Sequence, residues 1–381
     1  IKAIIDSHRS ELAYQTYLEL AINYYNKGLI DEAITILKIG PDVTINKIWE
    51  SFLERDKDKL KNIIESSSID FVFPFRRETI NAIGWAKSVL SRWEASYFLA
   101  LNLWALNRIN EAEENFLQLK EYPDESTFYV TRALFLEKTK KIDPLNDLKK
   151  AYNLNSNSWR IGKELTNYYL SKLKYDDAKK IVKKIYKKNR SNYMIGMDYI
   201  KTLIHLKEYN TAISLLDTLH ILPYEHAGEG RDLYTRAYFG ASLNYIKKLN
   251  YTRAISLLEK SKEWPENLGV GKPYNTDERI QDYLLYYCHF KMGKEANKYL
   301  QKIINYSRSN INMKSLFHAL GLEAIKKIEG NESSKMFLKK LVDSNHGSSK
   351  ETKWISNYAR NHSLIKEEFD NELLFNLLSL K

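Results

Sequence analysis

Two short segments of the sequence carry nearly the same set of chemically capable residues. They read EHAGEGR at 225–231 and ENLGVGK at 266–272, and both fit the pattern E-x-x-G-x-G-[K/R]. Each offers a carboxylate, a glycine-rich backbone that can turn its N–H groups outward, and a cation near the start of a helix. Backbone amides at a helix start favour anionic or strongly polar ligands. The carboxylates and Asn267 also suit the hydroxyl groups of a sugar.

These segments supply most of the candidate binding residues. The residues that we predict to contact a ligand or partner are Glu225, Glu229, Arg231, Glu266, Asn267 and Lys272, together with Arg76 from an earlier segment. The alternative is that the segments are only long turns, with glycines at positive φ and with Glu and Arg paired to neighbouring helices. A phosphate-binding P-loop does not fit, because the glycines are too closely spaced and Asp232 or Pro273 follows the basic residue.

Other catalytic or metal-binding motifs are absent from the sequence. It contains neither H-E-x-x-H nor G-x-S-x-G, and its single cysteine, Cys288, allows no internal disulfide and no cysteine-based zinc site. Cys288 and His289 are neighbours in the sequence, so on a helix their side chains point about 100° apart. We therefore predict no catalytic residue, metal or cofactor for this chain. One cysteine is compatible with the cytoplasm and with the bacterial periplasm.

A repeated pattern indicates which elements position these residues. It consists of Leu20 and Ala21, an aromatic residue at Tyr24, a turn, and then Ala33 and Leu37 on a second helix. Small residues allow two antiparallel helices to approach closely, and large ones fill the groove to the next pair. The pattern recurs around Ala100 and Ala112, Leu165 and Ala178, Tyr199 and Ala212, Ala241 and Ala254, and Tyr287 and Ala296, with a degenerate copy at 129–155.

The repeat spacing identifies the fold class. Ala178 and Ala212 are 34 residues apart, which is the period of the tetratricopeptide (TPR) repeat. We predict an all-α, right-handed TPR-like α-solenoid with a helical C-terminal cap. The expected parts are a first repeat (1–42), a divergent helical segment (43–92), repeats with two glycine-rich inserts (93–310), and a degenerate repeat with the cap (311–381).

The two glycine-rich segments are insertions into this array. Ala212 to Ala254 and Ala254 to Ala296 each span 42 residues, eight more than the repeat period. Each insertion lies between the second helix of one repeat and the first helix of the next. Because adjacent repeats are about 8–10 Å apart, we expect the two insertions to lie side by side.

Charge and hydropathy limit the partners. The 381-residue chain has a net charge of +11, and its densest basic run is at 179–190. There the lysines alternate with Ile181, Val182 and Ile185, which favours one amphipathic helix with a solvated basic face over a polyanion site. We expect no nucleic-acid partner. No stretch of 18 uninterrupted apolar residues is present, so we expect no membrane insertion.

Four strings resemble a known group of proteins. They are DFVFPFR (70–76), RWEASYFLALNLWALNRINEAE (92–113), ILPYEHAGEGRDLYTRA (221–237) and EWPENLGVGKPYNTDERIQDYL (263–284). They resemble the TPR half of large, poorly characterised bacterial proteins in which a β-sandwich domain similar to galactose mutarotase precedes the repeats. The resemblance runs over most of residues 10–300. It implies that this chain is the C-terminal part of a longer, carbohydrate-related protein.

The expected function follows from the repeats and the resemblance together. We predict a non-catalytic binding and scaffolding module that docks its own β-domain, another protein or a carbohydrate through the inserts. One alternative is part of a carbohydrate-active enzyme in which a loop carboxylate acts as acid or base. The other is a peptide-binding TPR adaptor that uses Lys, Arg and Asn side chains on its concave face.

Overall fold

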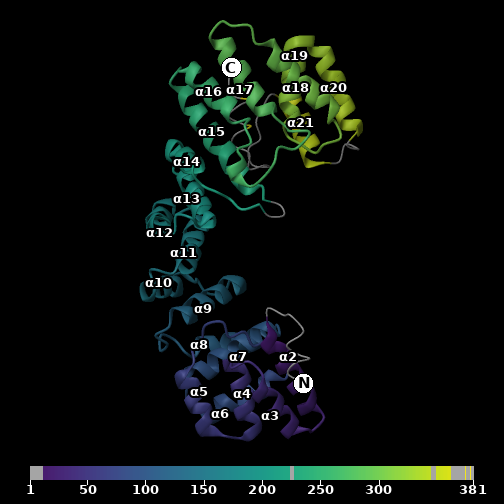
Figure 1. The fold of residues 1–381 in the computed structure, drawn as a ribbon. Coiled ribbons are helices and arrows are strands. Elements are labelled where there is room, and N and C mark those ends of the chain that lie inside the picture. The colour runs from purple at the N-terminus through teal and green to yellow at the C-terminus, as the bar shows by residue number, and fades with distance from the viewer. Residues whose placement is uncertain (1–11, 224–226, 345–348, 362–373, 375–377, 379–381) are drawn as a thin grey trace. The chain divides into compact units, whose positions relative to one another are not determined.

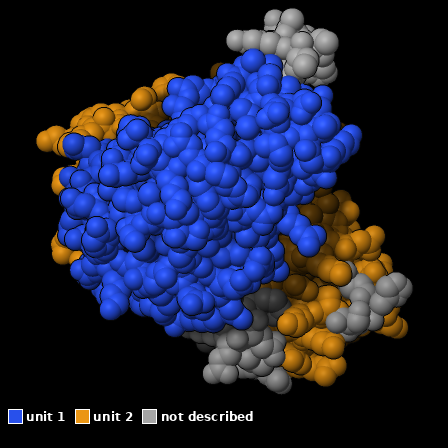
Figure 2. All heavy atoms as spheres, turned by 90° about the horizontal axis from the view of Figure 1, so that it is seen from below, with its two compact units in different colours: residues 1–165 blue, residues 166–381 orange. Residues whose placement is uncertain are grey.

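The computed structural model describes residues 12–223, 227–344, 349–361, 374 and 378 (Figure 1). Within these residues every regular element is helical, and no strand is present. The predicted all-α class is therefore confirmed. The chain forms two compact units, residues 1–165 and 166–381, which are coloured separately in Figure 2. Each unit is a stack of helices.

The first unit contains the helices before residue 166. They are α2 (Ala13–Asn26), α3 (Ile30–Ile39), α4 (Thr44–Glu54), α5 (Lys57–Ser66), α6 (Thr79–Val89), α7 (Trp93–Ala105), α8 (Ile109–Leu117), α9 (Ser126–Thr139) and α10 (Leu145–Leu154). Helix α11 (Trp159–Ser171) includes the boundary between the units.

The second unit contains the remaining elements. They are α12 (Tyr175–Lys188), α13 (Tyr193–His205), α14 (Tyr209–Leu216), α15 (Glu229–Lys247), α16 (Tyr251–Lys260), the 3-10 turn η1 (Glu266–Leu268), α17 (Arg279–Lys291), α18 (Asn297–Ser309), α19 (His318–Glu329), α20 (Asn331–Ser344) and α21 (Lys350–Asn361).

Helix pairs are closed by one recurring turn. After α2, the N–H of Gly28 donates to Tyr25 O and the N–H of Leu29 donates to Tyr24 O. This is the Schellman arrangement, which needs a residue with positive φ just after the helix. The same two bonds recur after α7, α11, α13, α15 and α17, where the positive-φ residues are Asn107, Leu173, Lys207, Leu249 and Gly293. These are the turns that the repeat pattern predicts.

Small residues lie where the paired helices meet. The alanines of the repeat pattern are buried at 5% exposure or less; they are Ala21, Ala33, Ala100, Ala112, Ala178, Ala212, Ala241, Ala254 and Ala296. Consecutive helices such as α2 and α3, α7 and α8, and α15 and α16 pack directly on one another. The paired helices therefore pack closely because alanines lie between them, as the sequence predicts.

The segment at 43–92 packs through large side chains instead. Trp49 on α4 is fully buried and donates a hydrogen bond from Nε1 to Thr79 Oγ1 at 3.1 Å. Its ring lies edge-on to Tyr25 and Phe52, with centroids 5.5 and 5.7 Å apart. Between α5 and α6 the chain runs as a non-helical segment from Ser67 to Glu78.

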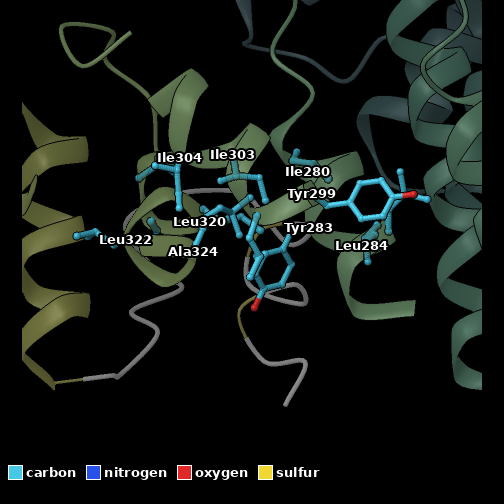
Figure 3. Packing of buried hydrophobic residues seen from close by; sticks show 14 of the residues in the cluster. Ile280, Tyr283, Leu284, Tyr299, Ile303, Ile304, Leu320, Leu322 and Ala324 are labelled. Atoms are coloured by element: carbon cyan, nitrogen blue, oxygen red, sulfur yellow. The ribbon is translucent and has the colours of Figure 1, made fainter. Parts of the chain in front are cut away.

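The C-terminal helices share one hydrophobic core (Figure 3). Residues such as Tyr283, Leu284, Ile303 and Leu320 meet there from α17, α18 and α19. Helix α21 packs on α19 and α20 and contributes the buried side chains of Trp354 and Ile355. The predicted helical cap is thus present. Leu374 is also buried, whereas residues 373, 375 and 377 lie outside the described residues.

Two further sequence features have clear positions. Helix α12 buries Ala178, Val182 and Ile185, and its lysines lie on the other faces. Among the helices described, none is both long enough and apolar enough to cross a membrane.

Candidate functional site: the paired inserts

The two glycine-rich insertions both lie in the second unit. We call residues 217–228 insert 1 and residues 261–278 insert 2; insert 1 connects α14 to α15, and insert 2 connects α16 to α17. The predicted site residue Glu225 belongs to the segment 224–226, which lies outside the described residues.

The two inserts are joined through their backbones. The N–H of Ile221 in insert 1 donates to the carbonyl oxygen of Asn267 in insert 2 at 2.8 Å. Gly269 has a φ of 72°, and a Cβ there would stand 2.6 Å from the carbonyl oxygen of Ile221. Only glycine allows this approach. The expected side-by-side placement is therefore realised in the geometry.

Asn267 fixes insert 2 to the end of the preceding repeat. Its Nδ2 donates to the carbonyl oxygens of Leu216 at 2.9 Å and Leu219 at 2.8 Å, where α14 ends. The last carbonyls of a helix have no partner within the helix, so this side chain supplies what they lack. Both amide hydrogens of Asn267 are used in this way, and the side chain acts within the inserts.

Arg231 is buried rather than presented to solvent. It is 7% exposed, and its Nη2 donates to the carbonyl oxygen of Ser261 at 2.6 Å, just after α16 ends. Its Nη1 donates to the hydroxyl of Thr235. The guanidinium lies over the ring of Trp264, with 4.5 Å from Cζ to the ring centroid. Burial lowers the pKa of Arg231.

Other charged residues in and beside the inserts form ion pairs. Glu229 Oε1 lies 2.8 Å from Lys201 Nζ on α13. Glu278 lies 3.2 Å from Lys272 and 3.4 Å from Lys262. The ion pair between Glu278 and Lys262 joins the two ends of insert 2. Burial lowers the pKa of Lys262, but its hydrogen bond with Asp282 and the charge of Asp282 outweigh burial, so the pKa is raised overall.

The outer surface of the inserts combines apolar and charged side chains. Leu222 is 66% exposed, and Tyr274 projects fully into solvent. Glu266 is exposed at the start of η1, and Lys272 retains 54% side-chain exposure beside Glu278. A partner can reach these insert residues.

Arg76 belongs to the first unit, whereas the inserts belong to the second. Its Nη2 lies 3.0 Å from Glu19 Oε2, and its Nε donates to Gln15 Oε1 at 3.2 Å. Its carbonyl oxygen accepts a bond from Asn102 Nδ2 at 3.1 Å. These bonds attach the end of the non-helical segment to α2 and α7.

Cys288 lies in the core, and the neighbouring His289 is partly buried. Cys288 is fully buried, and burial raises the pKa of its thiol to about 12. His289 bonds to the hydroxyl of Tyr299 at 3.3 Å, and burial lowers the pKa of His289. In the part of the chain that the structure describes, no group of three or more His, Cys, Asp or Glu side chains is placed to hold a metal ion.

One polar groove was not predicted from the sequence. It lies between the α13–α14 turn and the C-terminal half of α15 and has a volume of about 260 Å³. Its lining includes Lys207, Asn210, Asn244, Tyr245 and Lys248. The available signal was the Lys and Asn content of the turns, which does not separate a groove from an ordinary solvated turn.

Comparison with known proteins finds only solved structures of low sequence identity. No protein-family model matches the sequence, and no curated protein matches it. Among solved structures, a tetratricopeptide repeat protein from Parabacteroides merdae is 14% identical over 71% of this chain and 97% of its own, with a TM-score of 0.33. Yeast Tom70 is 11% identical over 96% of this chain and 92% of its own, with a TM-score of 0.35.

A further similar structure is YrrB, described as a TPR protein with an unusual peptide-binding site. It is 12% identical over 56% of this chain and 97% of its own, with a TM-score of 0.32. The TPR-like character of the helix pairs rests on the alanine positions and the recurring Schellman turns of this chain.

Proposed function

We propose that this chain is a non-catalytic scaffold that binds a partner protein through the paired inserts. The observation that carries the proposal is the way the inserts are locked. The bond from Ile221 to Asn267 and the two bonds from the Asn267 amide consume polar groups that a ligand site would need. They hold the backbone of the inserts in place, with the side chains of Leu222, Glu266 and Tyr274 exposed to solvent.

A rigid backbone that carries exposed apolar side chains suits a protein partner. Surface aromatic and aliphatic residues on a preorganised backbone lose little conformational entropy on binding. Tyrosine is also enriched at protein interfaces. Glu266 and Lys272 add charges of both signs at the margin, where charge contributes to partner choice more than to affinity. Arg231 and Asn267 support this surface from within, and Glu229 and Arg76 join neighbouring helices.

The resemblance to mutarotase-linked repeat proteins suggests the first partner to test. We propose a β-sandwich domain of the galactose-mutarotase kind as that partner, within a carbohydrate-related bacterial protein. The probe is a purified domain of this kind taken from a protein in which it precedes TPR repeats. Isothermal titration calorimetry would compare the wild type with a Leu222→Ser/Tyr274→Ser variant.

The control is Tyr122→Ser, which changes a tyrosine that is 77% exposed in the first unit. We expect the insert variant to bind at least about tenfold more weakly, a loss of about 1.4 kcal/mol, and the control to bind like the wild type. Equal binding by all three proteins, or no binding by the wild type, would reject this partner and this surface.

A second experiment separates the scaffold from the carbohydrate alternative. A thermal-shift series with mono- and oligosaccharides would be run on the wild type and on Glu266→Ala. The scaffold proposal predicts no sugar-dependent change in Tm for either protein. A shift that one sugar produces and that Glu266→Ala abolishes would instead place a sugar site on insert 2.

A further inference from the structure

Three phenylalanines project into solvent from the non-helical segment between α5 and α6. Phe71 is 82% exposed, Phe73 is 59% exposed and Phe75 is 45% exposed. Val72 and Pro74, which alternate with them, are buried. We call Phe71, Phe73 and Phe75 the aromatic strip. The two-residue alternation anchors the segment on one side and presents the aromatic strip on the other.

Folding alone does not account for this exposure. Phe71 has a φ of 60°, a left-handed conformation that is costly for a bulky side chain. Its ring gains little burial in return. Within the described residues, the backbone of 71–75 also makes no hydrogen bond. A strained, solvent-facing residue of this kind is typical of functional sites.

A hollow of about 260 Å³ lies beside the aromatic strip in the first unit. Phe71 and Phe73 line it together with Asp42 and Asp70, and neither lysine nor arginine contributes to its wall. Asp42 forms an ion pair with Lys47 at 2.6 Å on the side of α4. Asp70 accepts a hydrogen bond from the hydroxyl of Thr127 at the start of α9.

More carboxylates gather beyond Asp70. Asp124 and Glu125 are exposed just before α9, and Glu94 is buried on α7. We call Asp70, Glu94, Asp124 and Glu125 the acidic group. Burial raises the pKa of Glu125, and the charges of the other three raise it further. Glu94 Oε1 accepts a 2.7 Å bond from Arg92, whereas its buried Oε2 has no partner.

The charge of this surface is opposite to that of the whole chain. Arg92 is the cation bonded to the acidic group, and it also faces Glu65 at 3.8 Å. A chain with a net charge of +11 thus carries an acidic, aromatic surface here. The carboxylates of this surface would attract a basic segment. Its apolar residues can pack on the rings, and its cations can also lie over them.

We propose that the aromatic strip and the acidic group together bind an extended segment of a partner protein in which lysine or arginine alternates with apolar residues. The apolar side chains pack on Phe71 and Phe73, and a cation enters the hollow between Asp42 and Asp70. This surface belongs to the first unit, whereas the inserts belong to the second, and it adds a second binding function to the scaffold.

Fluorescence anisotropy with labelled synthetic peptides tests the proposal at about 0.15 M salt. The probe is a nonapeptide that alternates lysine with leucine. Two matched peptides replace its lysines by glutamate or its leucines by serine. We expect the lysine–leucine peptide to bind at least about tenfold more tightly than either, because both charge and apolar contact contribute.

Variants of the chain locate the peptide. Phe71→Ser/Phe73→Ser and Asp70→Asn/Glu125→Gln should each weaken binding at least about fivefold, or about 1 kcal/mol. Phe290→Ser and Glu332→Gln change exposed residues of the second unit and should leave binding unchanged. Circular dichroism would establish that each variant is folded.

Several outcomes would overturn the proposal. Equal binding of the glutamate peptide would remove the charge argument, and equal binding of the serine peptide would remove the aromatic argument. If both double variants bind the peptide as tightly as the wild type does, the peptide binds elsewhere. No binding of the lysine–leucine peptide by the folded wild type would exclude this class of partner.

Discussion

Leucine is an unusual residue at the turns between paired helices. Leu173 and Leu249 take the left-handed conformation that Gly28 and Gly293 take at equivalent turns, and both leucines are about 70% exposed. A side chain in this conformation costs roughly 1–2 kcal/mol relative to glycine, and glycine loses part of that advantage through the entropy of the unfolded chain.

We therefore expect Leu249→Gly to raise the free energy of unfolding by about 1 kcal/mol. Urea unfolding followed by circular dichroism would measure the change. Leu222→Gly is the control, because Leu222 is similarly exposed but does not have positive φ. This substitution should not raise the free energy of unfolding. A destabilised Leu249→Gly variant would show that the leucine side chain contributes more than its backbone costs.

His318 gives the second unit a dependence on pH. It is 1% exposed; its Nδ1 accepts from Arg279 at 3.1 Å and its Nε2 donates to Met313 O at 3.0 Å. Burial and the charge of Arg279 lower the pKa of His318 to about 4, against the weaker opposing effects of the Met313 hydrogen bond and of Asp277. The unfolded chain therefore binds the proton more readily between pH 4 and about 6.5.

The contribution of His318 to the free energy of unfolding should consequently be fully present above about pH 6.5 and decrease as the pH falls towards 4. Between pH 7.5 and 5.0 the loss from this residue is on the order of 2 kcal/mol. In His318→Gln, which can still accept and donate, the difference between urea unfolding at the two pH values should shrink by that amount. An unchanged difference would mean that other groups, such as His205, cause the pH dependence.

At the scale of elements, insert 2 supports the end of α14, the helix before insert 1. Asn267→Ala would leave the carbonyls of Leu216 and Leu219 without the partner that they have now. We expect a loss of about 2 kcal/mol in the free energy of unfolding, with faster hydrogen exchange at the end of α14.

Asn275→Ala is the matched control in the same insert, because Asn275 is exposed and bonds only to the Asn310 side chain. It should cost less than about 0.5 kcal/mol. Equal effects of the two substitutions would show that the Asn267 amide does not hold the inserts together.

The elements were more predictable from the sequence than the inserts were. Ala21 and Ala33 indicate close helix packing wherever they recur, because no larger residue fits there. The direction of a loop side chain has no such period. The sequence predicts that Asn267 and Arg231 contact a ligand or partner. It does not indicate their bonds within the chain, where the Asn267 amide donates to two carbonyls and Arg231 lies over Trp264. For 69–76 the sequence shows an apolar interruption but not which side faces solvent.

At the scale of the whole molecule, a destabilising substitution should affect mainly the helices around it. In repeat proteins each helix pair is stabilised mainly by its neighbours. Trp354→Ala would remove a buried side chain from the core of α17–α21, at a cost of about 3–5 kcal/mol. Hydrogen exchange should accelerate in α17–α21 and stay unchanged in α2–α8. Equal acceleration in both regions would show that the two units unfold as one.

Burial of the single cysteine has a practical consequence for labelling. Maleimides react with thiolates, and Cys288 is both fully buried and shifted to a pKa of about 12. The natural thiol should therefore stay unmodified at neutral pH while the protein is folded. Cysteines introduced at exposed positions such as Phe71 and Tyr274 would then be the reactive ones. A donor and an acceptor dye placed there would measure, by energy transfer, the separation of the two proposed binding surfaces in solution.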